Sequence, residues 1–89
     1  MERARLRRQL AAEFDTDAVR TVVRAAGDLA DSGQLAADAG YDLSADLVVD
    51  HLQDAPAGFT LVERWNWWVG SLELAYGHDY HQFRVRTVE

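Results

Sequence analysis

The chain has 89 residues, a length that suits one domain with a modest hydrophobic core, so we expect residues 1–89 to form a single domain. It contains no cysteine, which excludes disulfide bonds, thiolate metal sites and cysteine nucleophiles. Nine basic residues stand against 15 acidic ones, a net charge of −6, and no apolar run is long enough to cross a membrane. Because the arginine-rich start also lacks the apolar stretch of a secretory signal, we expect a cytoplasmic protein with no membrane partner.

The kinds of charged residue point to a salt-rich cell. All nine basic residues are arginine, lysine and isoleucine are absent, and ten aspartates outnumber five glutamates. The missing residue types have AT-rich codons and so indicate a GC-rich genome, while excess aspartate keeps a protein hydrated in concentrated salt. We therefore expect an acidic, halophilic, haloarchaeal protein, with a high-GC actinobacterial one as the alternative. In such a cytoplasm the acidic balance does not exclude an anionic partner.

Charge is unevenly spread along the chain. Residues 1–8 carry four arginines and one glutamate, a net charge of +3, whereas residues 9–58 carry ten acids and two arginines, a net charge of −8. Arginines ahead of an acidic body can bind nucleic acid or an acidic partner, or can pair with the acids of the body. The four residues concerned are Arg3, Arg5, Arg7 and Arg8. We favour ion pairs between them and the acids of residues 9–58, and we regard nucleic acid as a disfavoured partner.

The first part of the chain predicts three helices and a short helical turn. Apolar residues recur there at three- and four-residue spacing, with capping residues before the helices and glycines after two of them. The expected segments are residues 3–14, a helix from the cap at Asp15 to the stop at Ser32–Gly33, the short turn 34–39 ending at Gly40, and residues 44–53, where Leu43 and Val48 form a hydrophobic staple.

Residues 35–52 resemble a helix-turn-helix, in which a small residue and a glycine let the first helix pack closely on the second. Two features count against contact with DNA. The turn at residues 40–43 is long, and the exposed face of the second helix carries Asp46, Asp50 and Asp54, which phosphates repel. A plain helix-packing unit is therefore the favoured interpretation.

The segment after Pro56 fits two structures. Alternating apolar residues from Phe59 to Tyr76 fit a β-hairpin, as in the wing of a winged helix. However, Thr60–Leu61–Val62–Glu63 is a capping-box sequence, and Gly77 is a helix stop. Most of the apolar residues between them fall within one arc of a helix, and the coherence of that arc favours the helix.

The closing residues, 80–88, alternate the apolar Phe83 and Val85 with arginine and predict one β-strand. Such a strand pairs with the same strand of a second copy, pairs with a strand near Phe59, or lies extended over the helices. The expected fold is therefore mainly α (α+β), a helical bundle of about four helices with a short C-terminal β-strand. A winged-helix-like α+β fold is the alternative.

Three tryptophans lie close together in the predicted helix. On a helix Trp65 and Trp68 share the core face, while Trp67 points away from it, and Leu74 follows Trp67 seven residues later. Exposed apolar residues aligned in this way are typical of an interface, and a glycine between them lets another backbone approach. We therefore predict a homodimer, or an interface with another protein, through Trp67, Gly70, Leu74, Phe83 and Val85. Ordinary core packing and an aromatic platform for a ligand are the alternatives.

The run from Arg64 to Gly77 reads Arg-Trp-Asn-Trp-Trp-Val-Gly-Ser-Leu-Glu-Leu-Ala-Tyr-Gly. It resembles a segment of small haloarchaeal proteins whose activity is uncharacterised, of the kind studied by structural genomics. The resemblance covers about residues 60–89. The resemblance implies a haloarchaeal habitat, but it implies neither an activity nor any site residues.

Residues that carry chemistry are few. His78 and His81 lie three residues apart and are the candidates for a metal site, which His51, Asp50 and Glu73 could complete. Two histidines in a loop are more often solvated, and no serine or glycine-rich loop is placed for catalysis or phosphate binding. We expect no enzyme, no cofactor and no metal. The favoured function is a small non-enzymatic interaction protein, and a helix-turn-helix or winged-helix DNA-binding regulator is the alternative.

Overall fold

A computed structural model describes residues 1–86 of the chain. It is mainly α, and residues 1–86 contain no β-strand. Five α-helices and one 3₁₀-helix follow each other along the chain: α1 (Arg3–Ala11), α2 (Thr16–Ser32), α3 (Gln34–Ala39), α4 (Ala45–Gln53), α5 (Leu61–Tyr76) and η1 (His78–Phe83).

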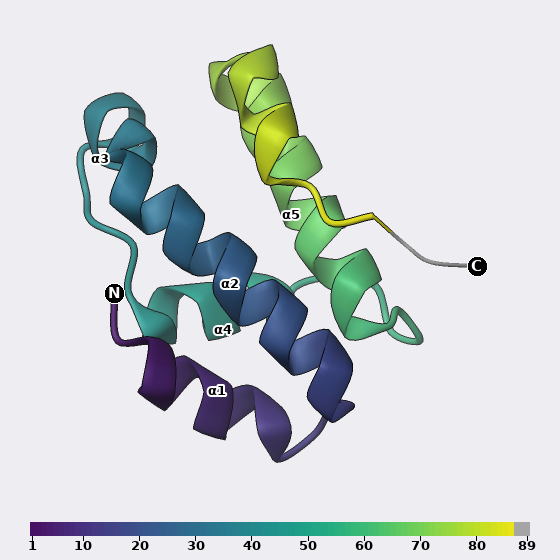
Figure 1. Ribbon diagram of the computed structural model, residues 1–89. Coiled ribbons are helices and arrows are strands. Elements are labelled where there is room, and N and C mark those ends of the chain that lie inside the picture. The colour runs from purple at the N-terminus through teal and green to yellow at the C-terminus, as the bar shows by residue number, and fades with distance from the viewer. Residues whose placement is uncertain (87–89) are drawn as a thin grey trace.

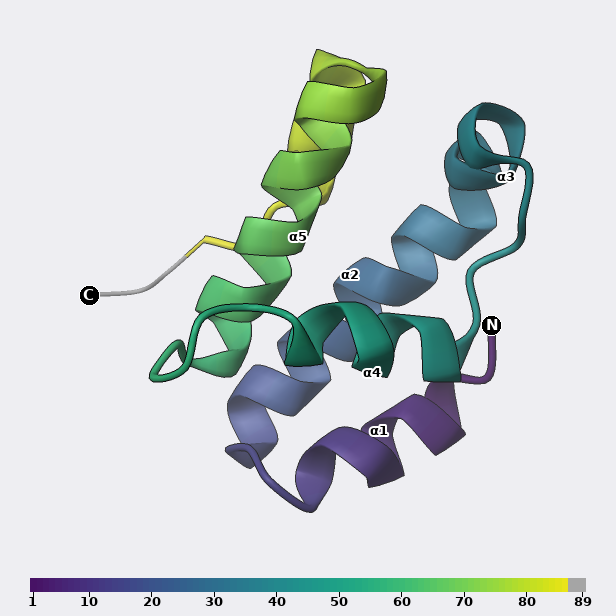
Figure 2. The same ribbon diagram turned by 180° about the vertical axis from the view of Figure 1, so that it is seen from behind.

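The four longer helices form a bundle around α2. Figure 1 shows α2 running through the middle of the molecule, with α1 below it and α5 beside it. The reverse view shows α4 in front of α2, where it contacts both α1 and α5 (Figure 2). The short α3 packs on the end of α2, and η1 folds back along α5. Within residues 1–86 no helix combines the length and apolar character needed to cross a lipid bilayer.

Most helix ends lie where the sequence predicts them, because the capping groups are local. The Asp15 side chain accepts a hydrogen bond from the Ala18 amide at the start of α2, and the Ser44 hydroxyl accepts one from the Leu47 amide at the start of α4. Gly33 follows α2 with a positive φ of 69°, a conformation that other residues rarely adopt. The first helix is shorter than expected, since it ends at Ala11 before Phe14.

Residues 61–76 are a helix, so the hairpin interpretation and the winged-helix alternative are wrong. The Thr60 hydroxyl accepts from the Glu63 amide at 3.2 Å, and the Glu63 carboxylate accepts from the Thr60 amide at 2.8 Å, which completes the predicted capping box. The buried side chains of α5 are those of the predicted arc: Leu61, Trp65, Trp68, Val69 and Leu72. Ala75 and Tyr76, which lie on the same face at the end of the helix, are exposed, because the last turn of α5 projects beyond the bundle.

The predicted C-terminal strand is also wrong for the described part of the chain. Residues 78–83 form η1, and residues 84–86 continue without regular structure; positions 87 and 88 of the predicted strand lie outside the described residues. Tyr80 and Phe83 are both buried, and three residues make one turn of a 3₁₀-helix, so the two rings share its inner side. Phe83 is thus buried by a short helical turn, and not by the alternation of inward and outward side chains that a strand would have.

Residues 35–52 do not form a helix-turn-helix. The helix α3 packs on α2, whereas α4 packs on α1 and α5. The helices α3 and α4 therefore do not form a close pair. Gly40 ends α3 with a φ of 84°, and the chain from Gly40 to Ser44 then crosses to the other side of α2 (Figures 1 and 2). The long turn therefore separates the helices, so the plain helix-packing unit expected for residues 35–52 is not formed either. Leu43 and Val48, the expected hydrophobic staple, are both buried.

Candidate interaction surface

The inner side of the tetrapeptide Trp65–Asn66–Trp67–Trp68 contributes to the core. Trp65 and Trp68 are buried, and their rings meet edge to face with centroids 5.4 Å apart. The ring of Trp68 also stacks on that of His51 from α4, with centroids 4.7 Å apart. His51, which was considered as a metal ligand, thus packs between α4 and α5, far along the chain from the other two histidines.

Two side chains of the tetrapeptide hold the end of η1 and the residues after it against α5. The Trp65 indole Nε1–H donates to the Phe83 carbonyl oxygen at 2.8 Å. Asn66 donates from Nδ2 to the Val85 carbonyl oxygen and accepts from the Val85 amide at Oδ1, both at 2.8 Å. Asn66 therefore pairs with both backbone groups of Val85, as a neighbouring strand would. Sequence reasoning missed this role; its only signal was an asparagine, a poor helix former, among three tryptophans.

The outer side of α5 forms a shallow groove of about 750 Å³. Trp67 and Leu74 both line it, with exposed fractions of 39% and 92%. Gly70 lies between them in sequence and lines the groove as well. The group closest to Gly70 is the Arg84 guanidinium, since a Cβ built on Gly70 would lie 3.1 Å from Arg84 Nη2. The groove thus has an apolar centre and charged flanks, supplied by Glu63, Glu73 and Arg84.

Phe83 and Val85, the other two residues of the predicted interface, lie elsewhere. Phe83 is buried in the core, and Val85 is half-buried and hydrogen-bonded to Asn66. Neither residue lines the groove that contains Trp67, Gly70 and Leu74. The structure therefore brings together the three α5 residues and separates them from the two C-terminal ones.

The metal candidates His78 and His81 both approach Glu73. Their imidazole rings stack with centroids 5.1 Å apart, and their Nδ1 atoms lie 3.8 Å and 3.2 Å from Glu73 Oε1. Arg84 Nε binds the other carboxylate oxygen at 2.6 Å, and this hydrogen bond lowers the pKa of Glu73. A bound cation would compete with the Arg84 guanidinium there. Among the described residues, no group of three or more histidines or carboxylates is placed to hold a metal ion.

The four N-terminal arginines divide into two pairs. Arg3 Nη2 lies 2.6 Å from Asp31, and Arg5 Nη2 lies 3.1 Å from Asp46, so these two form the pairing with the acidic body that we expected. Arg7 and Arg8 form no ion pair within residues 1–86. Both observed pairs are exposed and contribute little to stability.

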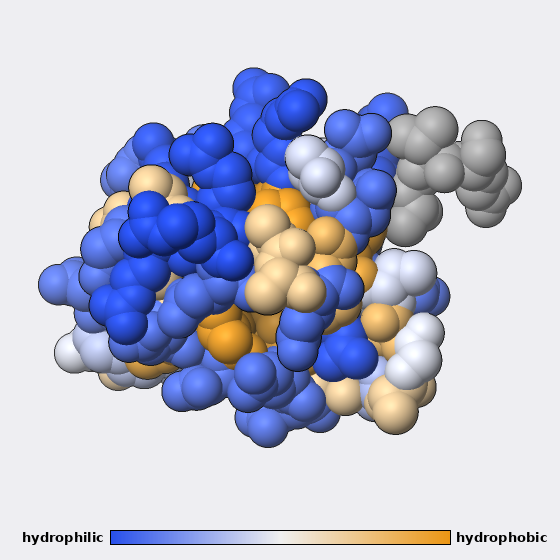
Figure 3. Space-filling view, turned by 90° about the horizontal axis from the view of Figure 1, so that it is seen from below, coloured by the Kyte–Doolittle hydropathy of each residue, from blue (hydrophilic) through white to orange (hydrophobic). Residues whose placement is uncertain are grey.

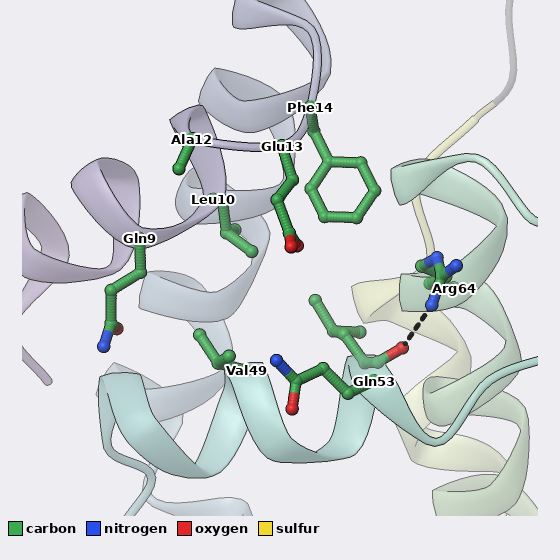
Figure 4. A pocket seen from close by; sticks show the side chains of 9 residues that line it. Gln9, Leu10, Ala12, Glu13, Phe14, Val49, Gln53 and Arg64 are labelled. Atoms are coloured by element: carbon green, nitrogen blue, oxygen red, sulfur yellow. Dashed lines mark hydrogen bonds between the residues drawn. The ribbon is translucent and has the colours of Figure 1, made fainter.

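A pocket of about 390 Å³ opens between α1 and α4 (Figure 4). Glu13 and Gln53 point toward each other across it, and Phe14 lies on its upper side. Arg64 closes one end: its Nη1 donates to the Leu52 carbonyl oxygen at 3.0 Å, and its guanidinium lies 5.7 Å from the centre of the Phe14 ring. Viewed from below, the molecule shows an apolar area bordered by hydrophilic side chains (Figure 3). Arg64 here acts as a structural link that satisfies the end of α4.

One family model matches residues 1–73 of the chain, that of the WNWW domain. The chain belongs to the WNWW domain family. The letters of the family name are those of the tetrapeptide Trp65–Asn66–Trp67–Trp68. No curated protein and no solved structure matches the chain.

The match to the WNWW domain covers α1 to α4 and most of α5, and it ends at Glu73. The resemblance expected from the sequence lay further along, at about residues 60–89, and the two overlap at the tetrapeptide. Residues 74–86 of this WNWW protein, which include η1 and Val85, therefore lie beyond the matched segment and bind back onto it through Trp65 and Asn66.

Proposed function

We propose that this WNWW protein is a small non-enzymatic interaction module that forms a homodimer through the outer face of α5. The observation that carries the proposal is the exposure of Leu74, 92%, in the same groove as a partly exposed Trp67. Within residues 1–86 the Leu74 side chain is almost uncovered, and the Trp67 side chain is covered only in part. Large apolar side chains aligned on one surface are typical of the centre of an interface.

The spacing along α5 supports a second copy of the chain as the occupant. Trp67, Gly70 and Leu74 follow one another at three and four residues, the spacing of a seam between two packed helices. If two α5 helices cross antiparallel near Gly70 and Ser71, the tryptophan of each copy meets the Leu74 side chain of the other. Ser71 is small at the crossing point, the exposed Arg84 guanidinium over Gly70 has to turn aside for a second helix to approach, and a twofold axis there makes the surface complementary to itself.

Charge on the flanks of the groove agrees with this arrangement. Glu63 and Glu73 carry negative charge on α5, and Arg84 carries positive charge beside Gly70. An apolar centre with a charged rim is the usual anatomy of a protein interface. Both signs of charge are present on the rim, and Arg84 and Glu73 neutralise each other within one chain, which leaves the charge of Glu63 at the edge of the groove.

The experiment is the mass of the protein in molar salt, measured by light scattering after size exclusion. We expect a dimer for the unmodified chain and a monomer for Trp67→Arg, because the guanidinium would be buried without a partner at the centre of the interface. The matched control is Tyr41→Arg, since Tyr41 is 38% exposed and does not line the groove. An unchanged mass for Trp67→Arg, with the helical circular dichroism retained, contradicts the proposal.

We further propose a cytoplasm rich in salt, that of a haloarchaeon, as the setting of the protein. The support is the absence of lysine and isoleucine together with ten aspartates against five glutamates. The alternative function, a helix-turn-helix or winged-helix DNA-binding regulator, has no support from α3 and α4. These helices do not pair closely, and α4 carries the acids Asp46 and Asp50.

A further inference from the structure

Arginines from three separate parts of the chain gather on the face formed by α1, α2 and the residues after η1. A hollow of about 410 Å³ between α1 and α2 is lined by four of them: Arg3, Arg7, Arg20 and Arg24. A second hollow, of about 330 Å³, is lined by Arg24, Arg84 and Arg86. Arg24 lines both, so the two hollows adjoin. These six residues are called the arginine band below.

The arginine band carries far more positive charge than the whole molecule would suggest. The chain has a net charge of −6, yet Asp28 is the one acid that lines either hollow. Within residues 1–86, four arginines of the band form no ion pair: Arg7, Arg20, Arg24 and Arg86. Like charges held close together repel each other, so an anion bound among them would lower the free energy of this face.

Close packing holds one end of the band in place. A Cβ built on Gly27 of α2 would lie 2.1 Å from Arg3 Nε and 2.5 Å from Arg3 Nη2. The Arg3 guanidinium therefore lies directly on the backbone of α2, where Asp31 holds it at 2.6 Å. A side chain fixed before binding loses less conformational entropy when a ligand arrives.

We propose that the arginine band binds the phosphate backbone of a nucleic acid strand. Guanidinium groups bind the anionic oxygens of a phosphate through paired hydrogen bonds, and successive phosphates of one strand can bind successive arginines of the band. A backbone phosphodiester has two anionic oxygens, as a carboxylate has, so what distinguishes a nucleic acid strand from an acidic peptide is its regular spacing of one negative charge per nucleotide.

The shape of the band favours a long ligand over a single small anion. A ligand that fills both adjoining hollows must carry several negative charges along its length, as a nucleic acid backbone does. Within residues 1–86, Phe83 is the aromatic residue that lines the hollows. Its side chain is buried and cannot stack on a base. The contacts are therefore to the backbone and carry little sequence preference.

The test is fluorescence anisotropy with a labelled 20-nucleotide DNA of mixed sequence, single-stranded in one arm and duplex in the other. Salt is lowered stepwise over the range in which circular dichroism shows intact helices. The double variant Arg20→Gln/Arg24→Gln is expected to bind at least about tenfold more weakly than the unmodified chain. For the single strand, the slope of log K against log salt should fall in magnitude by about 1.4, since each lost phosphate contact contributes about 0.7.

The matched control is Arg5→Gln/Arg8→Gln, which removes the same charge from residues that line neither hollow. It should bind within about twofold of the unmodified chain if the band, and not the net charge, makes the contacts. Gly27→Ala, which displaces the Arg3 guanidinium without removing a charge, should weaken binding several-fold.

Three results overturn the proposal. They are no binding at any salt concentration with intact helices, equal losses for the two double variants, and a poly-glutamate peptide that displaces the DNA at equal charge concentration. The last result assigns the band to an acidic peptide instead. None of the three bears on the mass of the protein, so this proposal and the proposed dimer can fail separately.

Discussion

The two sides of α5 use the same type of residue in opposite ways. On the inner side Trp65 and Trp68 are buried, contact each other, and have a hydrogen-bond or stacking partner each. On the outer side Trp67 and Leu74 are partly or largely exposed beside a shallow groove. Trp67 and Trp68 are neighbours in sequence, and the helical rotation of about 100° per residue is enough to send one outward and the other inward.

Helical phase, and not residue type, therefore separates structural from surface roles in this tetrapeptide. Asn66 adds a third role, because it lies at the edge of the inner side and binds the backbone of Val85. Tryptophan on the inner side should therefore matter for the stability of the single chain, and tryptophan on the outer side should matter for what the chain binds. Substitutions on the two sides can test that division.

Trp65→Ala is expected to have the largest effect on stability. It removes a fully buried aromatic ring and leaves the Phe83 carbonyl oxygen without its donor, so the free energy of unfolding should fall by about 3–5 kcal/mol. Urea denaturation followed by circular dichroism measures this loss. A fall below about 1 kcal/mol would mean that the two sides of α5 do not differ in the way described.

Asn66→Ala should have the next largest effect. Two hydrogen bonds to Val85 are lost, and we expect the free energy of unfolding to fall by about 1–3 kcal/mol. Hydrogen exchange should show faster exchange of the Val85 amide, with little change in α2. Asn66→Asp is the matched variant, since it keeps the acceptor for the Val85 amide and should leave that amide better protected than in Asn66→Ala.

Trp67→Ala should cost the single chain far less than the same substitution at Trp65. The Trp67 ring is 39% exposed and lies outside the hydrophobic core, so the expected loss is about 1 kcal/mol. The measurement is urea denaturation at protein concentrations low enough for a monomer. A loss equal to that of Trp65→Ala would show that Trp67 belongs to the core of the chain.

The Glu73 cluster should make a small, pH-dependent contribution. The hydrogen bond from Arg84 lowers the pKa of Glu73 below its ordinary value of 4.5, so the folded state favours the carboxylate. This stabilisation is present above pH 4.5 and is lost as the pH falls through the lowered pKa. Glu73→Gln should therefore unfold more easily than the unmodified chain near neutral pH, and the difference should shrink toward pH 3. A constant difference across that range contradicts the assignment.

The sequence predicts local features of this fold well. Capping groups such as Asp15, Ser44 and the Thr60–Glu63 pair act over three residues, so their effect is visible in the sequence. The inward positions of Trp65 and Trp68 follow from the same short-range periodicity. Leu74 and Trp67 were correctly expected outside the core for this reason.

Features that depend on distant parts of the chain were not predicted. The backbone of Val85 is satisfied by the Asn66 side chain, 19 residues earlier, so no neighbouring strand is needed. The arginine band likewise joins Arg7 to Arg24 and Arg86, which the charge pattern along the chain does not connect. Of the N-terminal arginines, Arg5 and Arg8 lie outside the band for reasons of helical phase.

The most direct test of the proposed dimer uses the absence of cysteine from the chain. Ser71→Cys places one thiol near the expected twofold axis, on an exposed position of α5. Under mild oxidation we expect a covalent dimer to form rapidly and to appear on a non-reducing gel. Ala37→Cys, an exposed position on α3, should stay largely monomeric under the same conditions. If Ser71→Cys cross-links no faster than Ala37→Cys, two copies do not meet through the outer face of α5.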